Sequence, residues 1–108
     1  AETIEKPFNS VLLNLYRNGN DSMGWHSDDE WEMGLDPVIA SISLGSSRKM
    51  KFRHRFDSQV SNFALELTKG SLLIMAGTTQ KFWQHEIPKT KKLVGERLNL
   101  TFRFIQSR

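Results

Sequence analysis

Arg97-Leu98-Asn99-Leu100-Thr101-Phe102-Arg103-Phe104 is the clearest strand signal in the sequence. Polar and apolar residues alternate in it with a period of two, so a strand here has one polar and one apolar face. The polar face carries Arg97, Asn99, Thr101 and Arg103. This pattern predicts a long β-strand.

Several other segments predict short strands, bounded by turns rich in Gly, Pro and Asn. They are 11–16, 38–44, 49–55, 62–67, 71–76 and 84–87. We expect Met50 and Phe52 to share a face, and Phe63, Leu65 and Leu67 to point inward. The only helical candidate is short, at 29–35. These features predict an all-β or mainly β fold, best a jelly roll, which gathers ligands from distant strands into one mouth.

The length and composition fit one globular domain, residues 1–108, with a modest core. Hydrophobic residues make up 38% and charged residues 25% of the chain, which excludes the disordered class. Cysteine is absent, so any metal must be held by nitrogen and oxygen ligands. The lack of cysteine also fits a reducing compartment.

The net charge of +3 and the isoelectric point near 9.5 are compatible with a nucleic-acid partner without requiring one. No apolar run approaches the length of a membrane span, and the first residues do not form a signal peptide. We therefore expect no membrane partner, no secretion, and a cytoplasmic location, or a nuclear one in a eukaryote.

Gly24-Trp25-His26-Ser27-Asp28-Asp29-Glu30 contains the strongest metal-binding pattern. In an extended segment His26 and Asp28 point to the same side and can take two positions on one metal ion. His85 is the natural third ligand, because His54 lies among basic residues. Two histidines and one carboxylate form the facial triad of non-haem Fe(II) oxygenases. Alternatively, the acidic residues of this segment form only a solvated loop.

The polar face of the last strand has two interpretations. Arg97 and Arg103 could hold a dicarboxylate, because a guanidinium grips a carboxylate with two parallel hydrogen bonds. Asn14 and Tyr16, which share a face of the first strand, could add amide and phenol hydrogen bonds. The other interpretation is an ordinary sandwich strand with one face in water.

Four short motifs together resemble the AlkB-type proteins, which are Fe(II)- and 2-oxoglutarate-dependent oxygenases that demethylate alkylated nucleic acid bases. In chain order they are Asn14-x-Tyr16, Gly24-Trp25-His26-x-Asp28-x-Glu30, Trp83-x-His85-x-Ile87-Pro88 and Arg97-x-Asn99-x-x-x-Arg103. The resemblance extends from about Phe8 to Phe104. It implies a double-stranded β-helix, a variant of the jelly roll, which agrees with the strand pattern.

The resemblance implies that His26, Asp28 and His85 bind Fe(II), with O2 as a further reactant. It also implies that Glu30 meets the substrate base near its exocyclic amine. The reaction would release formaldehyde, succinate and CO2 and leave the repaired base. The partner would be a methylated single- or double-stranded nucleic acid, and we expect a monomer.

For the co-substrate 2-oxoglutarate, the resemblance implies that Arg97 pairs with the distal carboxylate. Tyr16 and Asn14 would assist it. Arg103 and Asn99 would lie by the keto-acid end.

The basic segment 48–55, which includes Arg53 and Arg55, is the first candidate for contact with phosphates, and Lys89, Lys91 and Lys92 are the second. The alternative is a solvated strand edge that charge protects from aggregation.

One feature departs from the resemblance, because AlkB-type proteins usually carry an N-terminal region that includes a lid over the flipped nucleotide. Only about ten residues precede Val11, so we expect a minimal core or a fragment without most of that lid. Without most of the lid, the selectivity of the enzyme for particular bases would be affected. Rival functions are a 2-oxoglutarate oxygenase acting on protein or a small molecule, and a nucleic-acid-binding β domain without activity.

Overall fold

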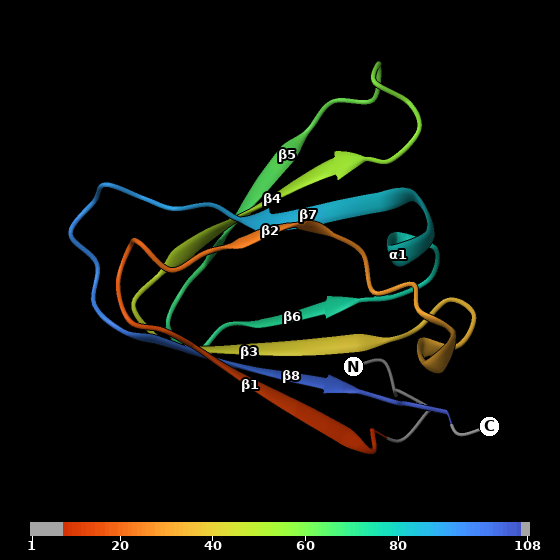
Figure 1. Ribbon diagram of the computed structural model, residues 1–108, viewed down its shortest axis with the longest axis horizontal. Helices are drawn as coiled ribbons and strands as arrows, with labels where there is room; N and C mark the ends of the chain where they lie inside the picture. The colour runs from red at the N-terminus through yellow and green to blue at the C-terminus, as the bar shows by residue number, and fades with distance from the viewer. Residues whose placement is uncertain (1–7, 107–108) are drawn as a thin grey trace.

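The alternating segments form two four-stranded antiparallel sheets that face each other in the computed structural model, which describes residues 8–106 (Figure 1). The major sheet has the order β1-β8-β3-β6, with β1 at Ser10–Tyr16, β8 at Arg97–Arg103, β3 at Ile39–Gly45 and β6 at Leu72–Met75. The minor sheet has the order β2-β7-β4-β5, with β2 at Met23–His26, β7 at Trp83–Ile87, β4 at Arg48–His54 and β5 at Phe63–Leu67.

The chain passes back and forth between the two sheets, and only β4 and β5 follow each other within one sheet. The connections therefore bring strands distant in sequence next to each other, as β1 and β8 are. This arrangement confirms the predicted jelly roll. The predicted strand bounds differ from the observed ones by a residue or two at their ends.

Helix is limited in residues 8–106 to one 3-10 turn, η1 at Trp31–Met33, and one short α-helix, α1 at Thr79–Phe82. The segment 29–35, expected to be helical, is thus helical only at η1, and α1 was not expected. Both lie at the same end of the sandwich (Figure 1). In the described part of the chain, no helix has the length and apolar character that crossing a membrane requires.

The hydrophobic core lies between the sheets and contains Tyr16, Met33, Ile39, Met50, Phe52, Leu67, Met75 and Ile87. Met50 and Phe52 share a face, as predicted, and both are buried, and the inward orientation predicted for Leu67 is confirmed. Phe63 and Leu65 lie on the same face of β5 as Leu67, and the Phe63 ring stacks on Phe52 at 4.7 Å, but the two residues remain 46% and 39% exposed. Both lie on β5, the edge strand of the minor sheet, where no further strand covers them.

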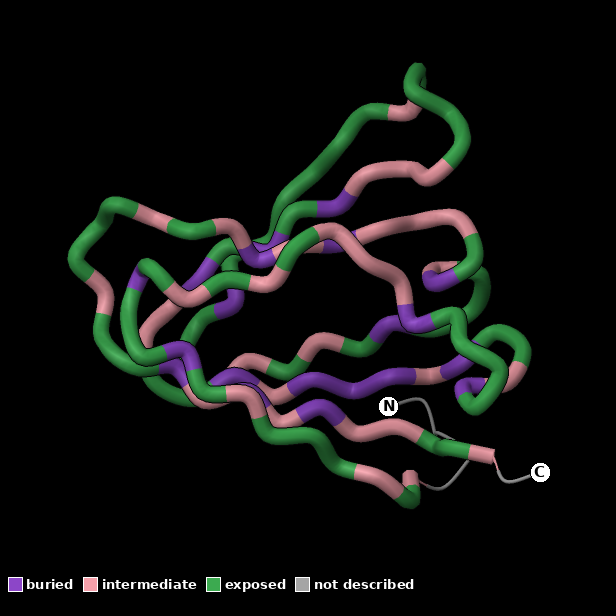
Figure 2. Tube along the Cα trace, viewed as in Figure 1, coloured by how far each residue is buried: buried purple, intermediate pink, exposed green. Residues whose placement is uncertain are grey.

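The polar face of β8 points into the molecule. Arg97, Asn99 and Thr101 are all buried, and Asn99 lies between Asn14 of β1 and Ser43 of β3 in the sheet register. Figure 2 marks buried positions along β8 and β3. The alternative of a strand with its polar face in water is therefore wrong, and the interior of the sandwich is partly polar.

The opposite face of the major sheet is apolar and open to solvent. One row of residues in register, Leu13, Leu100, Ile42 and Leu72, crosses all four strands. Its two ends, Leu13 and Leu72, are 57% and 58% exposed. We call this surface the outer aliphatic face.

Candidate active site

His26 and His85 lie side by side because β2 pairs with β7 in a register that sets one opposite the other. Their ring centroids are 4.2 Å apart at an interplanar angle of 62°. His26 Nδ1 lies 3.0 Å from the Gly24 carbonyl oxygen. Because a carbonyl only accepts hydrogen bonds, the proton of a neutral His26 is on Nδ1, which leaves Nε2 free to bind a metal.

His85 is buried, with 2% of its surface exposed. Burial and, second, the neighbouring His26 lower its pKa from 6.5 to about 4. The ring is therefore neutral at physiological pH, which is the form that binds metals. Its Nδ1 is buried and has no hydrogen-bond partner.

Asp28 follows β2 directly and is 8% exposed. Its carboxylate Oδ2 accepts a hydrogen bond from Arg103 NH2 at 3.0 Å. Its backbone N–H donates to Gln80 Oε1 at 2.8 Å. Two elements distant in sequence therefore hold Asp28 at the edge of the interior: β8 contacts its carboxylate and α1 its backbone N–H.

These side chains meet in one small interior cavity of about 30 Å³. Its lining includes Tyr16, His26, Asp28, His85, Asn99 and Arg103. In residues 8–106 no group of three His, Asp or Glu side chains already stands at metal-binding spacing. The donor set nevertheless fits Fe(II), because two imidazoles and a carboxylate share one cavity and the buried His85 Nδ1 lacks a hydrogen-bond partner among the described residues.

Arg97 provides a buried positive charge behind this cavity. It is 0% exposed, and its NH2 donates to Ser43 Oγ at 3.0 Å and, more weakly, to Asn99 Oδ1 at 3.4 Å. Its Nε and NH1 have no hydrogen-bond partner within residues 8–106. Burial lowers the pKa of Arg97, although the group remains a cation. A buried guanidinium with free donors and no carboxylate partner in residues 8–106 is a site for an anion.

Asn99 is committed to a network of hydroxyl groups. Ser41 Oγ donates to Asn99 Oδ1 at 2.6 Å, and Asn99 Nδ2 donates to Thr101 Oγ1 at 2.8 Å. Asn99 therefore positions β3 and β8 side chains around the cavity and has few hydrogen bonds left for a ligand. Ser41 and Ser43 were missed from the sequence, although they alternate with apolar residues in the segment 38–44.

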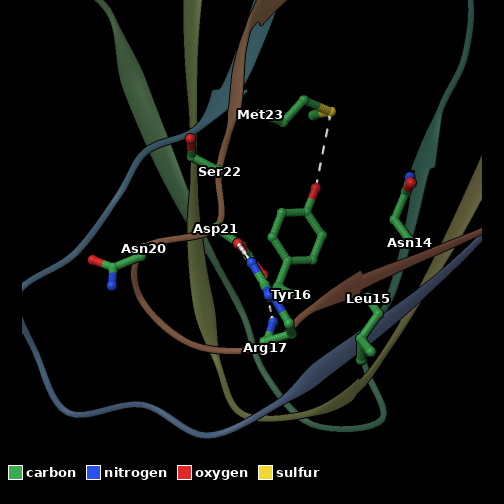
Figure 3. Close-up of a pocket in the computed structure, with 8 residues that line it drawn as sticks. All are labelled: Asn14, Leu15, Tyr16, Arg17, Asn20, Asp21, Ser22 and Met23. Carbon is green, nitrogen blue, oxygen red and sulfur yellow. Dashed lines mark hydrogen bonds and ion pairs between the residues drawn. The ribbon is translucent and has the colours of Figure 1, made fainter.

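Tyr16 separates the interior cavity from an open hollow of about 580 Å³ between β1 and the turn that leads to β2 (Figure 3). Its phenol points to Met23 Sδ at 4.0 Å, a weak contact that a carboxylate could replace. Burial raises its pKa, so it stays a phenol. Asn14 lines both spaces. The interior cavity alone has about the volume of one water molecule, so a five-carbon diacid must extend toward this hollow.

Figure 3 also shows how the turn beside the hollow is fixed. Arg17 and Asp21 form two side-chain hydrogen bonds, at 2.9 and 3.0 Å. The bonded Arg17 guanidinium holds the pKa of Asp21 well below its usual range. This exposed pair orders the turn without entering the cavity.

The residues predicted to contact substrate do not share the cavity. Glu30 is exposed at the start of η1, because the extended strand ends at His26. Arg53 donates to Gln84 Oε1 at 3.0 Å and covers the Trp25 ring at 4.3 Å. Arg55 pairs with Asp29 at 2.9 Å, beside Glu30.

The basic segment 48–55 is not one phosphate-contacting surface. Arg48 is 3% exposed and donates to the backbone carbonyls of Asn18, Asp21 and Pro88. The prediction is therefore wrong for Arg48. Its guanidinium is buried and donates hydrogen bonds to three backbone carbonyls, so it does not face a phosphate in solvent. Lys49 and Lys51 of the same strand remain exposed.

Gln80 is a site residue that the sequence did not reveal. It is 1% exposed and lies on α1. Its side-chain oxygen accepts the backbone N–H of Asp28, far away in sequence. A single glutamine between a turn and a strand carries no periodic or motif signal, so only the contact identifies it.

Residues 1–103 match the sequence pattern of the 2OG-Fe(II) oxygenase superfamily, where 2OG stands for 2-oxoglutarate. The chain belongs to this superfamily. As a 2OG-Fe(II) oxygenase, it has the donor set and the buried arginine expected of a domain that handles a metal and a dicarboxylate.

The relatives of this 2OG-Fe(II) oxygenase confirm the AlkB-type resemblance. The alpha-ketoglutarate-dependent dioxygenase alkB homolog 3 of Bos taurus is 45% identical over 111 residues, covering 96% of this chain and 39% of that protein. The DNA oxidative demethylase ALKBH2 of Bos taurus is 44% identical over 105 residues, covering 91% and 37%. The chain thus spans less than two fifths of the length of these curated relatives.

The solved structure of OsALKBH1 has the same fold, with a TM-score of 0.67 at 24% identity over 86% of this chain and 46% of that one. This match confirms the double-stranded β-helix expected from the strand pattern.

Proposed function

We propose that this chain is the catalytic core of an oxygenase that demethylates alkylated bases in DNA or RNA, using Fe(II), 2-oxoglutarate and O2. The observation that carries the proposal is the buried Arg97, with unpartnered donors, behind a cavity lined by His26, Asp28 and His85. The names of the relatives, a dioxygenase and a DNA oxidative demethylase, support the nucleic-acid substrate.

His26, Asp28 and His85 are the proposed metal ligands. His26 and His85 offer ring nitrogens, and Asp28 offers a carboxylate that now contacts Arg103. Metal binding therefore requires the Asp28–Arg103 contact to loosen or to be shared. Arg103 is then available for the keto-acid end of 2-oxoglutarate.

Arg97 is proposed to pair with the distal carboxylate through its free Nε and NH1. Tyr16, at 5.0 Å from the Arg97 guanidinium to its ring centroid, offers a phenol to the same group, and Asn14 offers its amide at the mouth of the hollow. Ser43 and Asn99 orient Arg97 by accepting hydrogen bonds from its NH2.

When bound, Fe(II) with 2-oxoglutarate and O2 supplies the oxidation that hydroxylates the N-methyl carbon. The co-substrate leaves as succinate and CO2. The hydroxymethyl group is then lost as formaldehyde: the C–N bond breaks, its electron pair stays on the base nitrogen, and the hydroxyl proton passes to that nitrogen in a neutral base or to solvent in a cationic one. The side chains of this chain bind and orient the reactants near the two histidines.

Glu30 is proposed to accept a hydrogen bond from the exocyclic amine of the extruded base. Its place on the same loop as Asp28 supports this role, and the Arg55–Asp29 ion pair fixes that loop at 2.9 Å. Arg53, on the outer side of the minor sheet, and Arg55, beside the loop that carries Glu30, are proposed to contact the nucleic acid. Their present partners, Gln84 and Asp29, leave some of their donors free.

The test is succinate release under Fe(II) and ascorbate, with and without methylated oligonucleotides, together with formaldehyde release. We expect 2-oxoglutarate turnover that increases with methylated oligonucleotide and produces formaldehyde. Turnover of 2-oxoglutarate without demethylation at any lesion would favour an oxygenase for protein or small molecules. Absence of iron-dependent 2-oxoglutarate binding would favour a nucleic-acid-binding domain without activity.

We also propose a monomer in the cytoplasm or nucleus. Light scattering on the purified chain tests the first part, and localisation of a tagged full-length protein tests the second.

A further inference from the structure

The back of the minor sheet carries a positively charged strip that the proposed active site does not use. On β4, Met50 and Phe52 point inward, so Lys49 and Lys51 point to the outer side. These two lysines line two adjoining grooves, of about 230 and 420 Å³. The strip is therefore separated from the interior cavity by the thickness of the sheet.

Two further lysines, Lys89 and Lys92, line the smaller groove. The carboxylates of the strip are Glu66 and Glu86, which lie opposite Lys49 and Lys51 in the register. None of the four lysines forms an ion pair within residues 8–106. Four exposed lysines against two glutamates leave the strip with a net positive charge.

The floor of the smaller groove is fixed by Arg48. Its guanidinium ties the turn after β1 to the Pro88 carbonyl at 2.8 Å. Thr90, in the groove wall, donates its backbone N–H to the Gly19 carbonyl at 2.9 Å. The lysines thus project from a backbone that is braced from below.

We propose that this strip, formed by Lys49, Lys51, Lys89 and Lys92, binds the phosphates of a single-stranded nucleic acid outside the active site. Lys49 and Lys51 are about 6.6 Å apart along the strand, a spacing comparable to that of successive phosphates in an extended single strand. Trp25, with the Arg53 guanidinium over its ring at 4.3 Å, lines the larger groove and offers an aromatic surface to a base.

This inference rests on the proposed function, because a polynucleotide is the substrate which that function assigns. It adds an anchoring surface that acts on long substrates alone. A nucleic acid that places one nucleotide in the cavity must extend around the edge of the sheet to reach the strip. A methylated mononucleotide is too short to contact both.

The test measures binding of a long unmethylated single-stranded thymidine oligonucleotide by fluorescence anisotropy over a range of salt concentrations. The variant is Lys49→Gln/Lys51→Gln, and the charge-matched control is Lys69→Gln/Lys81→Gln, at exposed lysines that line neither groove. Losing two phosphate contacts should lower the slope of log affinity against log salt by about 1.4. Affinity at low salt should fall about tenfold, and the control should retain the parent slope.

Demethylation of a methylated mononucleotide should be unchanged in the variant, while the KM for a long methylated oligonucleotide should rise. If both double variants lose the same affinity, or neither does, the strip is not the binding surface. Binding to anionic vesicles or acidic peptides in place of the oligonucleotide would overturn the proposal as well. Turnover of the mononucleotide by the parent tests the proposed function separately, so the failure of one can be told from the failure of the other.

Discussion

Arg97 is a buried cation whose stability depends on its ligand. Its burial without an anion costs free energy of folding, because an unpaired charge in the interior is poorly solvated. Arg48 is also buried, yet three carbonyl oxygens accept its hydrogen bonds. The two arginines therefore form a natural pair for comparison.

Arg97→Met should preserve or raise the thermal midpoint of the ligand-free chain, and should abolish its stabilisation by 2-oxoglutarate. Arg97→Ala should weaken 2-oxoglutarate binding by about 10- to 100-fold, since a charge-assisted hydrogen bond contributes about 1.5–3 kcal/mol. Arg97→Lys should rescue only part of the loss, because the fork geometry is missing. Thermal unfolding with and without 2-oxoglutarate measures both effects.

The control Arg48→Met should lower the midpoint, because it removes the guanidinium that donates to the carbonyls of Asn18, Asp21 and Pro88, of which Asn18 keeps only the Asp21 N–H. A 2-oxoglutarate requirement in Arg97→Met equal to that of the parent would make the dicarboxylate assignment wrong.

His85 makes the stability of the metal-free chain depend on pH. Its pKa in the folded chain is about 4, against 6.5 ordinarily, so between these values the unfolded chain binds a proton that the folded chain does not. The contribution of His85 to the free energy of unfolding is therefore fully present above pH 6.5 and is lost as the pH falls toward 4. It amounts to about 3 kcal/mol.

Urea unfolding of the metal-free chain across this range measures the effect. The free energy of unfolding should decrease as the pH falls, and His85→Gln should show a shallower decrease. An identical pH profile for parent and variant would contradict this account of His85.

At the scale of elements, α1 stabilises the loop that carries Asp28, a proposed metal ligand. Gln80 Oε1 accepts the Asp28 N–H at 2.8 Å, and Arg55 fixes the end of the same helix by donating to the Gln80 and Lys81 carbonyls. A side chain that orients a metal ligand typically affects metal affinity by 10- to 100-fold when removed.

Gln80→Leu keeps the approximate volume and removes the acceptor. It should weaken Mn(II) binding, followed by electron paramagnetic resonance, by about tenfold or more. The matched control is Gln84→Leu, because Gln84 bonds Arg53 on the outer side of the minor sheet. Equal Mn(II) affinity in the two variants would exclude a positioning role for Gln80.

The 3-10 turn η1 carries the proposed base-recognition residue at its start. Glu30→Ala should leave iron binding and 2-oxoglutarate turnover without substrate nearly intact, while demethylation falls by about tenfold. The loss should be larger for cationic bases such as 1-methyladenine and 3-methylcytosine, because only these gain from the negative charge.

Glu32→Ala provides the control, since Glu32 is an exposed carboxylate within the same turn. The assay compares formaldehyde release from methylated single strands with succinate release in their absence. Parallel loss of both activities in Glu30→Ala would assign this residue a structural role only.

At the scale of the whole molecule, the two sheets differ in what they expose. The minor sheet presents lysines to solvent, whereas the major sheet presents the outer aliphatic face. Exposed apolar surfaces that extend over several strands favour association or binding of apolar molecules. The proposed monomer is therefore tested most directly at this face.

The chain should bind the apolar dye 8-anilinonaphthalene-1-sulfonate, and Leu13→Lys/Leu72→Lys should reduce the dye fluorescence without lowering stability greatly. Both leucines are more than half exposed, so the substitutions bury no charge. Lys69→Leu on the turn beside the sheet serves as a control for a general change in hydrophobicity. Dye binding that is unaffected by the double substitution would place the accessible apolar surface elsewhere.

The sequence by itself determined the strands, the jelly-roll class and the chemical types at the site. Alternation of polar and apolar residues is a local property, so it is visible without knowing the fold. The spacing of His26 and Asp28 is local too. His85 was predicted as the third ligand because His54 lies among basic residues, and Arg97 because it lies on the polar face of the last strand and in the last AlkB-type motif.

Only the tertiary structure decided which face of each strand lies inside. The polar face of β8 is buried and the apolar face is open, opposite to the arrangement of an ordinary sandwich strand, because this interior surrounds a polar cavity. Arg48 is internal and Lys49 external, although the sequence gives both the same charge. Gln80 reaches Asp28 across 52 positions of the chain, a contact that chain folding alone creates.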